Sequence, residues 1–95
     1  MQPDKQNNNN LDLAATAIRH KTMLGARFIG VIYVDGQHFT HPNRIMGAAN
    51  TTRAKVVKEL RENVRETLNI HYISQHTIEL HVCDRQTEQV EKIKY

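Results

Sequence analysis

The sequence contains no tryptophan, one cysteine, two prolines and four glycines, and only 5% of its residues are aromatic. Because Cys83 is the only cysteine, no intramolecular disulfide can form. The few glycines do not build the glycine-rich loop that cradles phosphate groups in nucleotide-binding proteins. These absences argue against a disulfide-stapled domain and against a phosphate-loop enzyme.

Long apolar runs are also missing. No run approaches the roughly 20 apolar residues that a membrane-crossing helix needs. The opening stretch MQPDKQNNNN lacks the apolar core of a secretory signal. Residues 1–9 are polar and aperiodic, which is typical of a disordered tail. We therefore expect a cytoplasmic protein without membrane contact, with a tail over 1–9 and a single small domain over 10–95.

The first helical pattern follows Asn10, which is a suitable cap. Apolar residues then recur with spacings of three and four, at Leu11, Ala14, Ala15 and Ile18. This spacing predicts a short N-terminal helix.

The clearest local pattern is RFIGVIYV-DG-QHFTH, two β-prone runs joined by Asp35-Gly36. Asp-Gly favours a type I′ turn, and a two-residue loop pairs Val34 with Gln37 and Tyr33 with His38. The better core face of this hairpin holds Phe28, Ile32, Val34 and Phe39. The other face holds Ile29, Val31, Tyr33, His38 and Thr40.

A long amphipathic helix is predicted from a cap at Asn50, Thr51 or Thr52 to about Asn69. Its apolar stripe consists of Val56, Val57, Leu60, Val64 and Leu68. The basic residues Lys58, Arg61 and Arg65 lie along one flank. The acidic residues Glu59, Glu62 and Glu66 lie along the other.

The remaining segments complete the predicted fold. NRIMGAAN is interpreted as a connector, NIHYISQ as a loop, and RQTEQVEKIKY as a short helix with Val90 and Ile93 on one side. HTIELHVCD alternates as a half-buried strand with Ile78, Leu80 and Val82 inward. We expect an α+β fold: a three-stranded sheet, made of the β-hairpin plus a third strand after the helix, packed on one long amphipathic helix, with a short N-terminal helix.

The second sheet face is too apolar for solvent, since Ile29, Val31 and Tyr33 lie on it. The N-terminal helix, the C-terminal segment or a second copy of the chain could cover it. The last of these alternatives predicts a homodimer.

Six histidines raise the question of a metal or catalytic site. His38 and His41 are three apart and point to opposite faces of a strand. His38, His81 and Cys83 could share a face, but their spacing matches no zinc pattern. Cys83 with His81 or His76 is the only Cys/His combination, and no predicted glycine-rich turn or helix N-terminus lies beside it. We expect no metal, no cofactor and no enzymatic activity.

The net charge of +3 permits contact with nucleic acid. Arg44 and Arg53 flank the predicted entry to the long helix, beside Asn43 and the hydroxyl and amide groups of the cap region. The basic flank of that helix adds Lys58, Arg61 and Arg65. The first hypothesis is a small non-enzymatic regulatory protein that contacts nucleic acid through this modest basic surface.

The alternative hypothesis is a protein-interaction module or inhibitor, such as a regulator from a phage or mobile element. It would act through the other sheet face, at Tyr33, Val31, His38 and His81. A protein partner needs no basic excess, because charge pattern across an interface gives specificity. Both hypotheses remain open from the sequence.

Overall fold

The computed structural model describes residues 25–44 and 46–95, so the predicted tail and N-terminal helix lie outside the described residues. Within these residues one antiparallel sheet contains five strands. They are β1 (Phe28–Val34), β2 (Gln37–His38), β3 (Gly47–Asn50), β4 (Ile78–Asp84) and β5 (Gln89–Lys94). The sequence-based prediction of a three-stranded sheet is therefore wrong.

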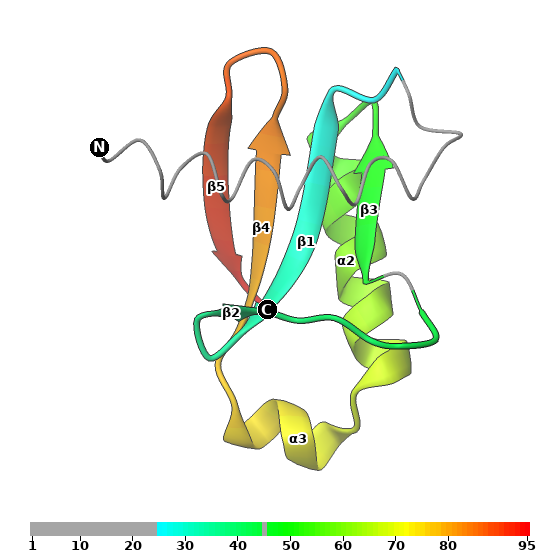
Figure 1. The fold of residues 1–95 in the computed structure, drawn as a ribbon, viewed down its shortest axis with the longest axis vertical. Helices are drawn as coiled ribbons and strands as arrows, with labels where there is room; N and C mark the ends of the chain where they lie inside the picture. Colours follow the sequence, from blue (N-terminus) through cyan, green and yellow to red (C-terminus); the bar gives the residue numbers. More distant parts are fainter. Residues whose placement is uncertain (1–24, 45) are drawn as a thin grey trace.

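Strand β1 lies in the middle of the sheet. It pairs with β4 along its whole length. Its other edge is shared by β2, opposite Tyr33 and Val34, and by β3, opposite Phe28 to Val31. Strand β5 extends the sheet beyond β4 and forms an edge (Figure 1).

The two additional strands, β3 and β5, occupy segments for which the sequence predicts other structures. The predicted connector contains β3, and the predicted C-terminal helix is β5. The β3 sequence GAAN has low intrinsic strand propensity, so its conformation depends on pairing with β1. In β5, Val90 and Ile93 lie on opposite faces because their strand partners are Cys83 and Leu80.

The hairpin prediction is confirmed at its turn. Asp35 and Gly36 both have positive φ, 52° and 83°, as a type I′ turn requires. Tyr33 pairs with His38 and Val34 with Gln37, as the two-residue loop predicts. Strand β2 contributes two residues to the ladder, and the N–H of Phe39 after it still donates to the oxygen of Ile32 on β1.

The long helix, α2 (Arg53–Thr67), lies across one face of the sheet behind β1 and β3 (Figure 1). Thr52 is its N-cap, with Oγ1 accepting a hydrogen bond from the backbone N–H of Lys55. Val56, Leu60 and Val64 are fully buried against the sheet. This apolar stripe confirms the predicted core side of the helix.

A second, short helix follows α2. This helix, α3 (Ile70–Gln75), replaces the predicted loop, and Asn69 caps it by accepting a hydrogen bond from the N–H of Tyr72. Tyr72 and Ile73 pack against the main core. Within the described residues, no helix is both long and apolar enough to cross a membrane.

The sheet face opposite α2 is also buried. Ile29, Val31, Tyr33, Ala49 and Cys83 form a second apolar cluster there, with Val90 packed against it. The C-terminal segment, one of the three expected covers of this face, instead forms β5 within the sheet. The expectation that this face is too apolar for solvent agrees with its burial.

Candidate nucleic-acid interface

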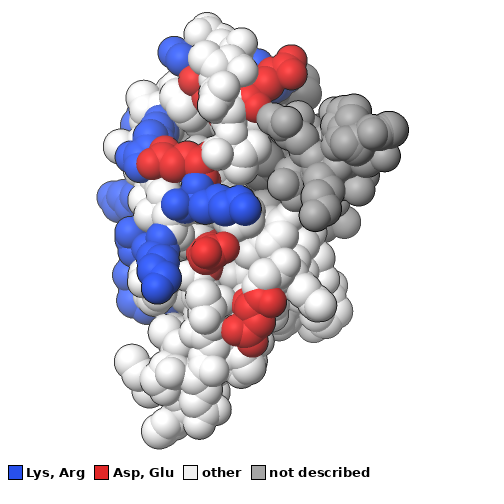
Figure 2. Space-filling view, turned by 90° about the vertical axis from the view of Figure 1, so that its left-hand side faces the viewer, with Lys and Arg blue, Asp and Glu red and all other residues white. Residues whose placement is uncertain are grey.

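The basic flank of α2 forms a continuous feature that we call the cationic row: Lys58, Arg61 and Arg65. Successive members are three or four residues apart, which places them on one side of the helix. At 1.5 Å per residue, the row is about 10 Å long. Figure 2 shows Lys and Arg side chains gathered along the side of the molecule on which α2 lies.

The cationic row borders a shallow groove of about 500 Å³. Ala54 and Val57 give this groove an apolar floor, and Glu62 is the acidic residue at its rim. Lys58 and Arg65 are exposed and make no ion pair with any residue that the structure describes. Their charges are therefore available to an anionic ligand.

Arg61 is held in place at the centre of the row. Its Nη2 lies 3.5 Å from the backbone oxygen of Lys94, and its guanidinium lies over the ring of Tyr95, 5.7 Å from the centroid. The N–H of Tyr95 donates to the oxygen of Ile78, which continues the β4–β5 ladder. The end of β5 thus places an aromatic ring beside the cationic row.

Arg53, the first residue of α2, forms a two-bond ion pair with Glu91 on β5, at 2.6 and 2.8 Å. This hydrogen bonding lowers the pKa of Glu91 and raises that of Arg53. Both side chains are about half exposed. Arg53 therefore borders the groove with its charge already compensated.

Arg44 and Arg53 are not brought together. Arg44 contacts Glu66 at 3.3 Å, and Glu66 lies thirteen residues beyond Arg53 on α2. At 1.5 Å per residue, that separation is about 20 Å along the helix. Asn43, whose backbone N–H donates to Nδ1 of His41, lies beside Arg44. Arg44 and Asn43 therefore lie near the acidic flank of α2 and not near the start of that helix.

The polar groups at the start of α2 are engaged in local hydrogen bonds. Thr52 caps the helix, Oδ1 of Asn50 accepts from the N–H of Thr51, and Nδ2 of Asn50 donates to Glu59. The groups at this helix N-terminus that were expected to bind an anion therefore already have hydrogen-bond partners within the protein.

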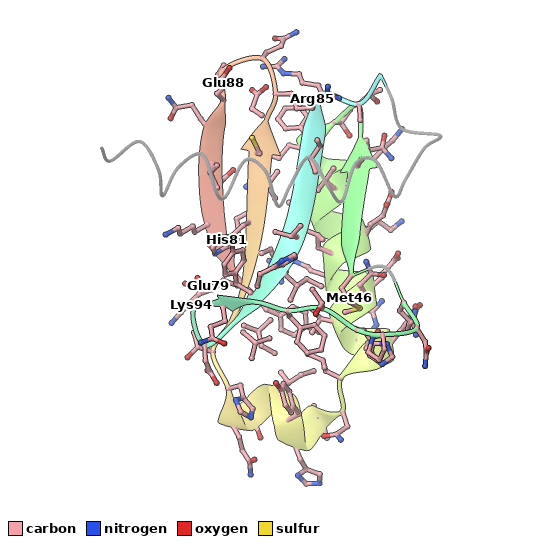
Figure 3. The ribbon with its side chains drawn as sticks, in the orientation of Figure 1. Met46, Glu79, His81, Arg85, Glu88 and Lys94 are labelled. Carbon is pink, nitrogen blue, oxygen red and sulfur yellow. The ribbon has the colours of Figure 1, made fainter. Side chains whose placement is uncertain are left out.

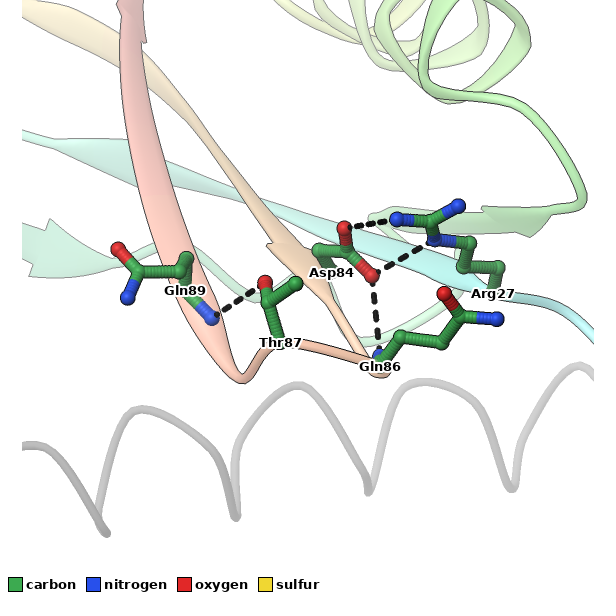
Figure 4. A network of polar contacts seen from close by, with 5 residues as sticks. All are labelled: Arg27, Asp84, Gln86, Thr87 and Gln89. Atoms are coloured by element: carbon green, nitrogen blue, oxygen red, sulfur yellow. Dashed lines mark hydrogen bonds and ion pairs between the residues drawn. The ribbon is translucent and has the colours of Figure 1, made fainter.

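A second hollow, of about 360 Å³, lies between Phe28, Val82, Asp84 and the β5 residues Gln89 and Glu91. Asp84 at its edge binds Arg27 through two hydrogen bonds and accepts from the N–H of Gln86 (Figure 4). Arg53, which lines this hollow, and Arg27, which binds Asp84, are both ion-paired. The groove along α2 is the better site for an anion.

The alternative interaction face is buried in this structure. Val31 is 0% exposed, Tyr33 9% and His81 5%. The rings of Tyr33 and His81 stack with centroids 3.8 Å apart, and His38 lies beside Tyr33. The structure brings these four residues to one face, but a protein partner would reach three of them only after that face is uncovered.

His81 is the polar residue within this buried face. Its Nε2 lies 3.1 Å from Glu79, its Nδ1 has no hydrogen-bond partner in the described structure, and burial lowers its pKa. Figure 3 shows Glu79, His81 and Lys94 close together on β4 and β5. No three His, Cys, Asp or Glu side chains in residues 25–44 and 46–95 are grouped to hold a metal ion.

Cys83 is buried on the same face. Burial raises the pKa of its thiol, whereas a cysteine nucleophile needs a lowered one. His76, one of its two predicted partners, instead contacts Asp35 at the β1–β2 turn. The geometry therefore gives no support to the Cys83 and His76 combination.

Sequence reasoning missed the contribution of β5 to the candidate interface. Glu91, which compensates Arg53, and Tyr95, which lies under Arg61, were both assigned to a C-terminal helix. The alternation of β5 is masked by its charges, because Glu91, Lys92 and Lys94 occupy both faces. Only the pairing with β4 reveals which of these residues face α2.

No family model, no curated protein and no solved structure matches this chain.

Proposed function

We propose that this protein is a non-enzymatic binding protein that contacts nucleic acid through the cationic row on α2. The observation that carries the proposal is that Lys58 and Arg65 are exposed, lie on one side of one helix and lack an ion-pair partner among the described residues. Phosphate groups are the natural counterpart of such a row, because each Lys or Arg contact releases a condensed counterion.

Arg44, Arg53 and Asn43 have a smaller place in this proposal than the sequence alone suggested. The ion pairs of Arg44 with Glu66 and Arg53 with Glu91 reduce the attraction of both arginines for a phosphate. Arg61 remains in the row, because its contacts are with a backbone oxygen and an aromatic ring and leave its charge uncompensated.

The proposal is tested with a matched pair of double variants. Lys58→Ala with Arg65→Ala removes two charges from the row, and Lys55→Ala with Lys92→Ala removes two exposed charges outside it. We expect the first pair to weaken retention on DNA or RNA at low salt and the second to leave most of it. Three phosphate contacts predict a log–log salt slope of about −2 for a single strand and −3 for a duplex.

The first double variant loses two of these contacts, so its slope should be shallower by about 1.4 for a single strand and about 1.8 for a duplex. Equal weakening by both pairs would show that binding follows net charge and not the cationic row. If the wild-type protein binds neither DNA nor RNA at low salt, the proposed function is wrong.

A further inference from the structure

An exposed aromatic ring lies beside Arg61 at the centre of the cationic row and gives the candidate interface a second kind of contact. Tyr95 is 37% exposed and is one of two large apolar side chains that are exposed among the described residues. The other, Ile70, lies on α3. Tyr95 is therefore the exposed ring that accompanies uncompensated charge.

The backbone of Tyr95 is anchored to β4, and its ring contacts Arg61. Its backbone N–H is bound to Ile78 at 3.0 Å, and Arg61 lies over the ring while its Nη2 reaches the oxygen of Lys94. A ligand can extend this stack of Arg61 on Tyr95, because a nucleobase stacks on either an aromatic ring or a guanidinium plane.

From this geometry we infer that the ligand of the cationic row is a single-stranded nucleic acid, with one unpaired base stacked at Tyr95 and Arg61 and the adjoining phosphates at Lys58 and Arg65. This inference rests on the proposed function and names its ligand class. A base inside a duplex is stacked on its neighbours and presents no free face to a protein ring. Only an unpaired strand can use Tyr95 and the row together.

The groove beside the row fits the same ligand. Its apolar floor, Ala54 and Val57, suits the uncharged part of a nucleotide, and its basic rim suits the phosphates. An acidic peptide would satisfy the charges but would gain nothing specific from the ring. This difference allows the base contact to be tested apart from the charge contact.

The test uses two strands with the same number of phosphates: an oligothymidylate and its abasic counterpart. Base–aromatic stacking predicts that the wild-type protein binds the oligothymidylate about 5- to 150-fold more tightly. Tyr95→Ala should lose most of this difference, because only the guanidinium of Arg61 remains to stack on the base. Tyr95→Phe keeps the ring and should behave like the wild type. The melting curve of each variant shows whether it is folded.

The charge variant separates the two proposals. Lys58→Ala with Arg65→Ala should weaken binding to both strands and preserve the ratio between them. If the wild type binds the two strands equally, or if Tyr95→Ala leaves the ratio unchanged, the stacking inference is wrong and the proposed function stands. If a duplex of equal charge binds more tightly than the oligothymidylate, the single-strand inference is also wrong.

Two further outcomes would overturn the proposed function itself. One is that no strand binds more tightly to the wild type than to the Lys58→Ala, Arg65→Ala variant. The other is that a polyglutamate of equal charge binds as tightly as the oligothymidylate, which would make the row a general anion surface.

Discussion

Nδ1 of His76 lies 2.6 Å from Oδ2 of Asp35, so the β1–β2 turn is joined to the start of β4. Oδ1 of Asp35 accepts a second hydrogen bond from the N–H of Thr77, and the N–H of Asp35 donates to the oxygen of Thr77. The ring of Tyr72 stacks on His76. One carboxylate therefore connects the hairpin turn to the segment that leads from α3 into β4.

This connection predicts a pH dependence. The hydrogen bond from His76, followed by that from Thr77, lowers the pKa of Asp35. Because the folded pKa lies below the unfolded value of about 3.9, the contribution to stability is present above that value. It is lost as the pH falls through the lower, folded pKa.

Asp35→Asn is the matched variant, since Asn also tolerates the positive φ of this position. We expect it to lower the free energy of unfolding at pH 7 and to have a smaller effect near pH 3. Urea unfolding at both pH values measures this. An equal loss at both would show that the charge of Asp35 does not matter.

Gly30 is where α2 comes closest to the sheet. A Cβ at this position would lie 2.5 Å from Cδ1 of Leu60 and 2.7 Å from Cγ1 of Val56, both of which belong to fully buried side chains. Overpacking of a filled core typically costs about 1–3 kcal/mol. We therefore expect Gly30→Ala to lower the free energy of unfolding by about that amount, measured by urea denaturation.

Gly25 supplies the control for this substitution. A Cβ there would meet no atom within 4 Å, so Gly25→Ala should change stability by less than about 0.5 kcal/mol. If the two variants are equally stable, the close packing of α2 on Gly30 is wrong.

Some elements of this fold can be predicted from the sequence, and others cannot, because only some of them have a local sequence pattern. The Asp35-Gly36 turn and the Val56, Leu60, Val64 stripe are local patterns, and both are confirmed. Strands β3 and β5 have no comparable local pattern, since one is built from small residues and the other is charged. Both depend on hydrogen bonding to strands distant in sequence.

The same limit applies to the candidate interface. The cationic row follows from helical spacing alone and was predicted. The ion pairs that compensate Arg44 and Arg53 join residues 22 and 38 positions apart, which no local pattern encodes. The sequence therefore identifies the basic residues, but only the fold shows which of their charges remain available.

Arg27 and Asp84 form the ion pair that closes the end of the sheet near the β4–β5 turn. Their two hydrogen bonds, at 2.9 and 2.7 Å, are the main reason that the pKa of Asp84 falls to about 2. Since the unfolded value is about 3.9, this contribution to stability is complete above pH 4 and is lost as the pH falls toward 2.

Arg27→Met removes the partner of Asp84 and keeps an apolar stem of similar length. We expect its thermal melting temperature to lie below that of the wild type at pH 6 and to approach it near pH 2. Arg85 lies at the same end of the sheet and donates to the backbone oxygen of Ala26, so Arg85→Met serves as the control. Parallel pH profiles for wild type and Arg27→Met would contradict the assignment.

The rate at which the Cys83 thiol reacts measures how readily the sheet face opposite α2 becomes exposed. It is 6% exposed, and burial raises the pKa of its thiol, so both access and ionisation disfavour reaction with a disulfide reagent. We expect labelling of the native protein to be at least about tenfold slower than in urea at the same pH. Equal rates would show that this face opens readily, which would favour the alternative of a protein partner bound there.

The Arg53–Glu91 ion pair gives a variant that should strengthen nucleic-acid binding. Glu91→Gln removes the carboxylate that compensates Arg53 and leaves the arginine at the rim of the groove. A unit charge at about 4 Å in water is worth about 1 kcal/mol, so affinity should rise by about fivefold at low salt. The control is Glu88→Gln, which removes an exposed carboxylate at the β4–β5 turn that does not line the groove. If Glu88→Gln raises the affinity as much as Glu91→Gln does, the gain comes from net charge. In that case Arg53 does not belong to the binding surface.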